Sequence, residues 1–128
     1  MKFINYNANP KGRKTGDCVI RAIAFALNKS WVDTYRGLFE NTVKTFYSVS
    51  SKENFKSYLK SLGIEMEKMP RKLDGKRYTV SEFCDEIAKP NMTYIISVAN
   101  HLTCVRDKAL VDTWNCGHKS VGNYWIIY

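Results

Sequence analysis

Apolar residues recur at helical spacing in the first half of the chain. Between about Asp17 and Leu27 they follow the i, i+3, i+4 pattern of a helix with one buried face, and Asn28 suits its C-terminal cap. A second helix is predicted to begin after Ser30, because Asp33 follows three residues later, as in a helix-capping motif. The apolar stripe predicted for this second helix consists of Trp31, Tyr35, Leu38 and Phe39.

The helical pattern continues beyond this stripe. We expect the second helix to fray over residues 42–50, and a third helix to span about Lys52 to Leu62, with Gly63 at its C-terminal end. The residues expected to face inward from the third helix are Phe55, Tyr58, Leu59 and Leu62.

The period of the pattern changes at Pro90. Before it, "TVSEFCDEI" predicts a short helix that begins at Thr79 or Ser81 and ends before the proline. After it, "MTYIISVANH", "LTCVRDKALVDTW" and "NYWIIY" have the apolar runs of strands, and the middle segment contains a tight turn at Asp107–Lys108.

Helices therefore fill the first two-thirds of the chain, after an irregular segment at residues 1–16, and an antiparallel sheet fills the end. This segregation is typical of an α+β fold, with N-terminal helices packed on a C-terminal sheet. The pattern contains no internal repeat, linker or low-complexity segment. A chain of 128 residues is then expected to form one domain, residues 1–128.

The net charge of +8 is concentrated in residues 68–77, which hold five positive charges and one negative charge. Clustered Lys and Arg bind phosphates, but no nucleic-acid-binding motif accompanies this segment, and Tyr78 is its only immediate aromatic neighbour. We expect a solvated basic loop, or a surface for an acidic partner, rather than a nucleic-acid site.

Signals for membranes and export are not apparent. No apolar run approaches the roughly 20 residues of a membrane span, and the first residues contain no apolar core of a secretory signal. Four cysteines, at positions 18, 84, 104 and 116, form no CxxC pair. We therefore expect reduced thiols in a cytoplasm, with no metal and no cofactor.

Cys18 stands at the start of the first predicted helix, directly after Asp17. The free N–H groups of a helix start and the positive end of its dipole favour a thiolate over a thiol. Asp17 opposes this effect unless its carboxylate caps the helix. Cys18 is therefore either a nucleophile or a buried structural thiol, whereas Cys84, within the short helix, is expected to be structural.

The number of residues in the hairpin turn, even or odd, determines which side chain could orient His101 as a base. A two-residue turn pairs Val105 with Leu110, and this register places Asp112 diagonally next to His101 on the same face of the sheet. An odd-numbered turn would favour Asn115 instead. We prefer Asp112, because two-residue turns are the commoner hairpin connection.

Histidine occurs at only one other position, His118, in a glycine-containing loop where we expect it to be exposed. A zinc site formed by Cys104, Cys116, His118 and His101 is the metal alternative. Its spacing fits no common structural zinc pattern, and Cys104 points away from His101 in the preferred register.

These groups occur in an order that resembles the papain-like cysteine peptidases: a cysteine at a helix start, a histidine at a strand start, and an acid or amide on the next strand. The segment "DTW" at 112–114 is similar to their Asn-Ser-Trp segment, and "VGNYWIIY" resembles the glycine-rich aromatic strand that follows it. The resemblance to papain itself covers only these three site segments. It implies a papain-like fold and a triad of Cys18, His101 and Asp112, with Trp114 shielding the histidine.

A second resemblance covers nearly the whole chain. The segments "NPKGRKTGDCVIRAIA", "MPRK", "VANHLT" and "DTWNCG" are similar to those of small uncharacterised proteins of Gram-positive bacteria and their phages.

The sequence departs from the papain pattern in the oxyanion hole. Papain-type enzymes usually place a Gln about six residues before the cysteine, but Gly12 occupies that position here and the chain contains no Gln. The backbone N–H of Cys18 can be one donor to the developing oxyanion. We expect Asn7 or Asn9 to supply the other, and the alternative, if neither reaches the site, is a chain that has lost activity.

We therefore expect a cysteine-dependent hydrolase, a peptidase, isopeptidase or amidase, that acts on a peptide or protein substrate, including an acidic one. The alternative is a non-catalytic papain-like binding module, phage-encoded and host-directed, that holds an acidic protein or a nucleic acid. The enzyme requires a reactive Cys18, whereas the binding module requires salt-sensitive affinity without that reactivity.

Overall fold

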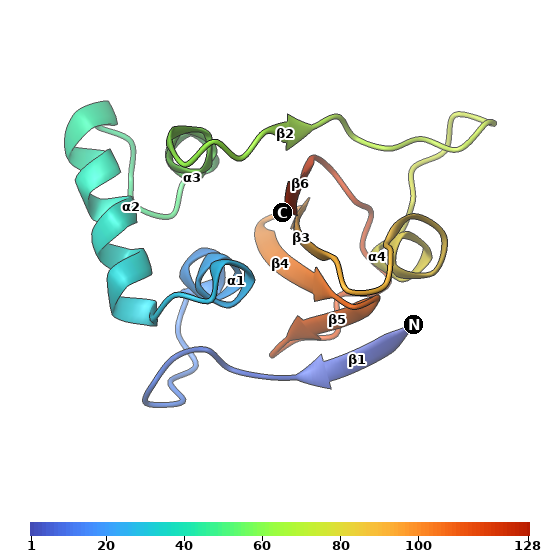
Figure 1. The fold of residues 1–128 in the computed structure, drawn as a ribbon, viewed down its shortest axis with the longest axis horizontal. Coiled ribbons are helices and arrows are strands. Elements are labelled where there is room, and N and C mark those ends of the chain that lie inside the picture. Colours follow the sequence, from blue (N-terminus) through green and yellow to red (C-terminus); the bar gives the residue numbers. More distant parts are fainter.

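A computed structural model describes residues 1–128 as an α+β fold with a six-stranded mixed sheet (Figure 1). The helices are α1 (Cys18–Leu27), α2 (Trp31–Thr45), α3 (Lys52–Ser61) and α4 (Val80–Glu82), which continues as the π-helical turn η1 (Phe83–Ile87). The strands are β1 (Lys2–Asn5), β2 (Met66–Glu67), β3 (Thr93–Val98), β4 (His101–Arg106), β5 (Ala109–Asp112) and β6 (Tyr124–Ile127).

The predicted helices form, and their ends have the expected caps. Asn28 ends α1 in the left-handed region at φ 54°, and the side chain of Ser30 accepts a hydrogen bond from the backbone of Asp33 at the start of α2. The short helix begins after Thr79, which forms a capping box with Glu82. The predicted fraying of α2 is wrong for residues 42–45, because the helix continues to Thr45.

Three side chains predicted to face inward do not. On α2, Leu38 is fully buried, but Tyr35 and Phe39 are 39% and 49% exposed. On α3, Leu62 is 43% exposed. The apolar spacing located each helix correctly but did not reveal how little of α2 the rest of the chain covers.

The sheet order is β1-β5-β4-β3-β6-β2, and the hairpin between β4 and β5 has the predicted register. Val105 pairs with Leu110, and the turn residues Asp107 and Lys108 both have positive φ, at 51° and 63°. Such φ values at both central positions are typical of the two-residue turns whose twist matches that of the strands they join. Asn100, also at positive φ, lies in the turn before His101, which is the first residue of β4.

Two expectations about the sheet are wrong. Residues 2–5 are not irregular but form β1, which runs parallel to β5, so the sheet is mixed rather than antiparallel. The two-residue strand β2 was not predicted and pairs with β6. Both strands are short, exposed edge strands held by partners far away in the sequence, and their own residues carry little periodic signal.

The sheet separates two apolar clusters (Figure 1). On one face, α1 packs on β4, with α3 and the buried Leu38 of α2 completing the layer. On the other face, α4 and η1 supply Phe83 and Cys84 to the second cluster. None of the helices is long and apolar enough to cross a membrane.

Candidate active site

Cys18 is the first residue of α1 and lies half-buried where this helix meets the start of β4. Burial raises the pKa of its thiol, but hydrogen bonds with His101 and the backbone of Leu102, and the nearby charge of Arg21, outweigh that effect. The net result is a thiol whose pKa lies below its ordinary value. Pairing with an imidazole is the usual way in which proteins make a cysteine nucleophilic.

The predicted histidine partner lies against the predicted carboxylate. The Nε2 atom of His101 is 2.6 Å from Oδ2 of Asp112, the last residue of β5. The same carboxylate oxygen accepts a hydrogen bond of 2.6 Å from the hydroxyl of Thr103, and Oδ1 accepts one from the backbone N–H of Thr113. These bonds leave Nδ1 of the imidazole for the thiol.

This carboxylate controls the protonation of the histidine. Burial alone would lower the pKa of His101, but its contacts with Asp112, Cys116 and Cys18 raise that pKa to about 11. Burial alone would raise the pKa of Asp112, yet its hydrogen bonds with His101 and Thr103 hold it below its ordinary value. The arrangement therefore favours an imidazolium beside an ionised carboxylate at neutral pH, next to a thiol whose pKa is lowered.

Trp114 lies beside the histidine, as expected of a shielding residue. Its ring is 5.0 Å from that of His101 in an edge-on arrangement, and it remains 41% exposed. His118 is exposed, as predicted, with its ring 5.9 Å from the other side of Trp114. Asn115 is exposed, and its side-chain oxygen accepts a hydrogen bond from the backbone of Gly117 instead of contacting the histidine.

Asp17 neither caps α1 nor faces the thiol as a free charge. Its carboxylate accepts hydrogen bonds from Arg21 at 2.7 Å, from Trp31 at 2.9 Å and from Asn9 at 3.1 Å. Burial opposes ionisation of this carboxylate, but these three donors outweigh it and lower its pKa. The N–H groups in the first turn of α1 therefore receive no side-chain cap.

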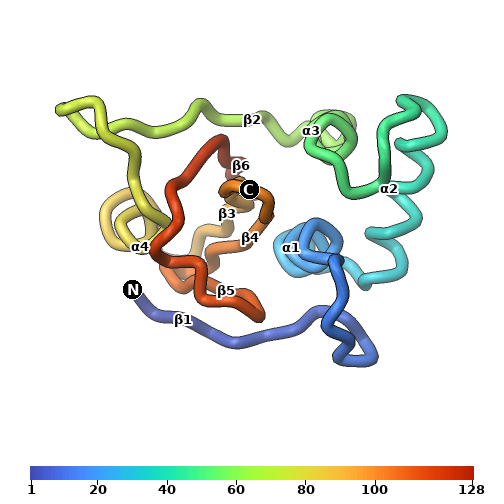
Figure 2. Tube along the Cα trace, turned by 180° about the vertical axis from the view of Figure 1, so that it is seen from behind, coloured from blue at the N-terminus to red at the C-terminus, as the bar shows by residue number.

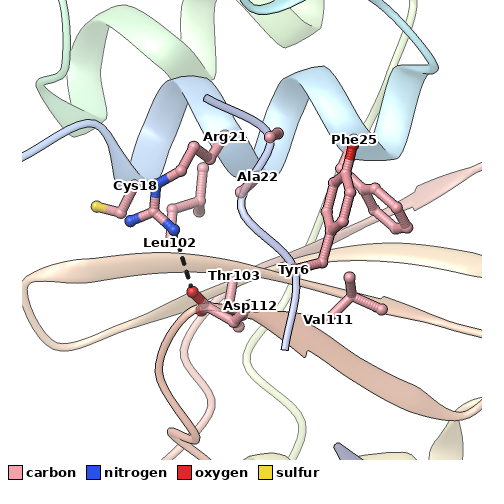
Figure 3. Close-up of a pocket in the computed structure, with 10 residues that line it drawn as sticks. Tyr6, Cys18, Arg21, Ala22, Phe25, Leu102, Thr103, Val111 and Asp112 are labelled. Atoms are coloured by element: carbon pink, nitrogen blue, oxygen red, sulfur yellow. Dashed lines mark hydrogen bonds and ion pairs between the residues drawn. The ribbon is translucent and has the colours of Figure 1, made fainter. Parts of the chain in front are cut away.

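Arg21 is a site residue that the sequence analysis missed. Besides Asp17, its guanidinium contacts Asp112 at 3.4 Å and the hydroxyl of Thr113 at 3.0 Å, so it joins the start of α1 to the end of β5 (Figure 3). In this view the sulfur of Cys18 points away from the part of the pocket lined by Tyr6 and Phe25. The i, i+4 spacing of Asp17 and Arg21 is visible in the sequence, but the contact with Asp112 spans 91 residues.

The two asparagines expected to complete an oxyanion hole bind elsewhere. The amide of Asn7 donates to the backbone oxygen of Arg13, and that of Asn9 donates to Asp17. Their side-chain oxygens accept hydrogen bonds from backbone N–H groups of the same segment. These contacts hold the loop before α1 in place, and neither amide has a hydrogen bond directed at Cys18.

The proposed zinc set is not assembled. Cys104 belongs to the apolar cluster under α1, while Cys116 belongs to the cluster on the opposite face of the sheet. The three possible ligand atoms that do lie within 4.8 Å of one another are those of His101, Asp112 and Cys116. The Asp112 oxygens already bind five groups of the chain, including the positive Arg21, and this competes with binding of a cation.

Cys116, which the sequence analysis named only as a zinc ligand, is a second group beside the histidine. It is fully buried in the loop after β5, and its sulfur lies within 4.8 Å of a ring nitrogen of His101. Nothing in the spacing of this loop identifies that contact, because the loop is irregular and its path is determined by tertiary packing.

An open groove begins at Cys18 and His101. Its apolar lining residues are Val19, Phe55, Val98 and Leu102, and its polar ones are Ser50, Lys52, Ser97 and Asn100. Lys52 is the one formally charged side chain of this lining. The groove therefore exposes the thiol–imidazole pair to a ligand that lies between α3 and the turn before β4.

The basic segment 68–77 lies at a corner beyond α4 and on the opposite side of the molecule from α2 (Figures 1 and 2). Three of its five positive side chains bind groups of their own chain. Lys72 pairs with Glu82, Arg71 donates to the backbone oxygen of Gly75, and Arg77 donates to that of Val121.

Comparisons of the chain with protein-family models, with curated proteins and with solved structures found no match.

Proposed function

We propose that the chain is a cysteine-dependent hydrolase that cleaves an amide, isopeptide or ester bond, with Cys18 as nucleophile, His101 as base and acid, and Asp112 as the group that orients the imidazole. The observation that carries this proposal is the placement of His101 between Asp112, at 2.6 Å, and the low-pKa thiol of Cys18 at the head of an open groove. The papain-like resemblance supports the same roles.

The first step would form a bond between Sγ of Cys18 and the substrate carbonyl carbon, moving the carbonyl π electrons onto oxygen. That oxyanion would lie near the uncapped N–H groups in the first turn of α1, which stabilise negative charge. Collapse of the intermediate breaks the bond to the leaving group, which takes a proton from the imidazolium of His101.

The second step would use water to release the acyl group. Neutral His101 takes a proton from the water as its oxygen attacks the thioester carbon, and the thiolate of Cys18 departs. The Asp112 carboxylate stabilises the imidazolium each time it forms and fixes which ring nitrogen faces the thiol.

The binding-module alternative receives less support. It depends on the basic segment as a binding surface, but Lys72 is neutralised by Glu82, and the guanidinium groups of Arg71 and Arg77 are already held by backbone oxygens of their own chain. The cations that remain are exposed single charges, which contribute little specific affinity for an acidic partner.

The test uses p-nitrophenyl acetate, an activated ester that requires no knowledge of the natural substrate. We expect a burst of nitrophenol and an acetyl group on Cys18, found by peptide mass mapping, and neither in Cys18→Ala. The matched control Cys84→Ser removes a thiol from the other face of the sheet and should leave the burst unchanged. An acetylation rate at Cys18 that is the same in His101→Ala would overturn the proposal.

A further inference from the structure

The outer face of α2 carries a row of exposed apolar side chains. The helical members of this row are Val32, Tyr35, Phe39 and Val43, which are 44%, 39%, 49% and 60% exposed, and Phe46 follows at the C-cap with 90% exposed. With 3.6 residues per turn, the four helical members lie within about 80° of arc on one face. We call these five residues the α2 stripe.

No other part of the chain covers the α2 stripe. The inner face of α2 buries Thr34 and Leu38, and Gly37 on that side lies so close to Tyr58 of α3 that a Cβ atom would be 2.8 Å from its ring. Both overall views show α2 at the outer edge of the molecule, with α1 and α3 on its inner side (Figures 1 and 2). Contiguous exposed apolar rows of this kind mark interaction surfaces.

The stripe is symmetric about its central residue. Successive members are three, four, four and three residues apart, so the pattern reads the same in both directions from Phe39. A second copy of α2, placed antiparallel across a two-fold axis at Phe39, would therefore bring Tyr35 opposite Val43 and Val32 opposite Phe46. Such self-complementarity is what a closed two-fold interface requires.

The charges beside the stripe have nearly the same symmetry. Asp33, Arg36, Glu40 and Lys44 follow one flank of the stripe, and none of them forms an ion pair within the chain. Asp33 and Lys44 are centred between residues 38 and 39, and Arg36 and Glu40 on residue 38, so in the antiparallel arrangement Asp33 lies near Lys44 of the second copy and Arg36 lies near its Glu40. A parallel two-fold arrangement would place the charged flanks of the two copies on opposite sides of the interface, where these charges do not meet.

We propose that the α2 stripe docks on the α2 stripe of a second copy of this chain, antiparallel, to form a symmetric dimer. One helix per protomer buries less than the roughly 1,000 Å² expected of a stable biological interface, so the dimer should be weak, with a dissociation constant on the order of micromolar. The proposal does not depend on the chemistry of Cys18.

Sedimentation velocity over a concentration series from about 1 to 200 μM would test it. We expect the wild-type chain to shift from monomer to dimer across the series. Phe39→Glu, which places a carboxylate on the two-fold axis against its own copy, should remain monomeric throughout. Leu73→Glu changes a fully exposed apolar residue in the basic segment and should dimerise like the wild type.

A charge exchange distinguishes this antiparallel dimer from non-specific hydrophobic association. Arg36→Glu alone and Glu40→Arg alone should each weaken association about tenfold, and the double variant Arg36→Glu/Glu40→Arg should restore it, because both partners then exchange signs together. Circular dichroism confirms that each variant is folded. A wild-type chain that stays monomeric, a dimer that survives Phe39→Glu, or singles that the double variant does not rescue would each overturn the proposal.

Discussion

Two thiols on opposite faces of the sheet, one half-buried and one fully buried, show what makes a cysteine reactive. Cys18 is the first residue of α1, whereas Cys84 is the fifth residue of the continuous segment formed by α4 and η1. Burial raises the pKa of Cys84 to about 12, and the negative charge of Asp85 adds to that effect. The pKa of Cys18 is lowered instead.

The difference lies in the partners, since burial opposes ionisation of both thiols. On the α1 face, the thiol has an imidazole, a backbone donor at Leu102 and the nearby charge of Arg21. On the α4 face, Phe83 and Val80 surround the thiol with apolar atoms. The polar and cationic partners of Cys18 therefore distinguish it from Cys84, and the predictions below remove the charged groups of the α1 face one at a time.

Arg21→Met should have the largest effect, on stability. It leaves the buried carboxylates of Asp17 and Asp112 without their shared cation, which we expect to lower the free energy of unfolding by about 3 kcal/mol. Urea unfolding measures this. The matched control is Lys72→Met, which breaks the solvent-exposed pair with Glu82 on the α4 side and should change stability little. Equal losses in the two variants would contradict the difference between the faces.

The stabilisation that involves Arg21 should also depend on pH. Both carboxylates have folded-state pKa values below their unfolded ones, so their contribution is present above about pH 4 and is lost as the pH falls through the folded values. The wild type should therefore lose more stability than Arg21→Met between neutral pH and about pH 3. Parallel acid profiles for the two proteins would show that the arginine does not hold these carboxylates ionised.

His101→Ala should have the next largest effect, on reactivity. Without the imidazole, burial dominates and the pKa of Cys18 should rise to at least the ordinary thiol value of about 8.5. We expect alkylation of Cys18 by iodoacetamide at pH 7 to slow about 100-fold, and its rate to rise about tenfold per pH unit up to the new pKa. The rate at Cys84, measured in the same digest, should not change. A wild-type profile with the same steep slope at neutral pH would mean that the histidine does not ionise the thiol.

Asp112→Asn should have a smaller effect of the same sign. An amide can still orient the imidazole but cannot stabilise its positive charge, so the pKa of Cys18 should rise and alkylation at pH 7 should slow about tenfold. Asn115→Ala is the matched control and should leave the pH profile unchanged, because Asn115 binds Gly117. The reverse result would assign the orienting role to the asparagine.

Much of this site could be predicted because it depends on local rules. The two-residue turn at Asp107–Lys108 determines which residues face each other across the hairpin. This register follows from the sequence alone, and it places Asp112 next to His101. The helix that carries Cys18 followed from periodicity and from the cap at Asn28.

The rest depends on contacts between distant segments. Arg21 reaches Asp112 across 91 residues, Cys116 reaches His101 through an irregular loop, and β1 is a strand only because β5 lies beside it. Asn7 and Asn9 were expected at the thiol because they precede it, but the fold uses their amides to fix the segment before α1. A single sequence does not show directly which distant segments of the chain are in contact.

Lys52→Met should have the smallest effect, and this effect is on the preference of the groove for anionic over neutral reagents. Lys52 is the one formally charged side chain of the groove lining, it is exposed, and it lies 3.3 Å from the side-chain oxygen of Asn123. Its charge should attract an anionic reagent to the thiol more than a neutral one, by about twofold for an exposed cation. We therefore expect Lys52→Met to halve the ratio of the Cys18 alkylation rates with iodoacetate and iodoacetamide, and salt to reduce the wild-type ratio in the same way.

Lys60→Met removes an exposed charge from the same helix but outside the groove, and the ratio should not change. Because the ratio cancels any change in the thiol itself, an unaltered ratio in Lys52→Met would show that the groove has no preference for anionic substrates, whatever the reactivity of Cys18.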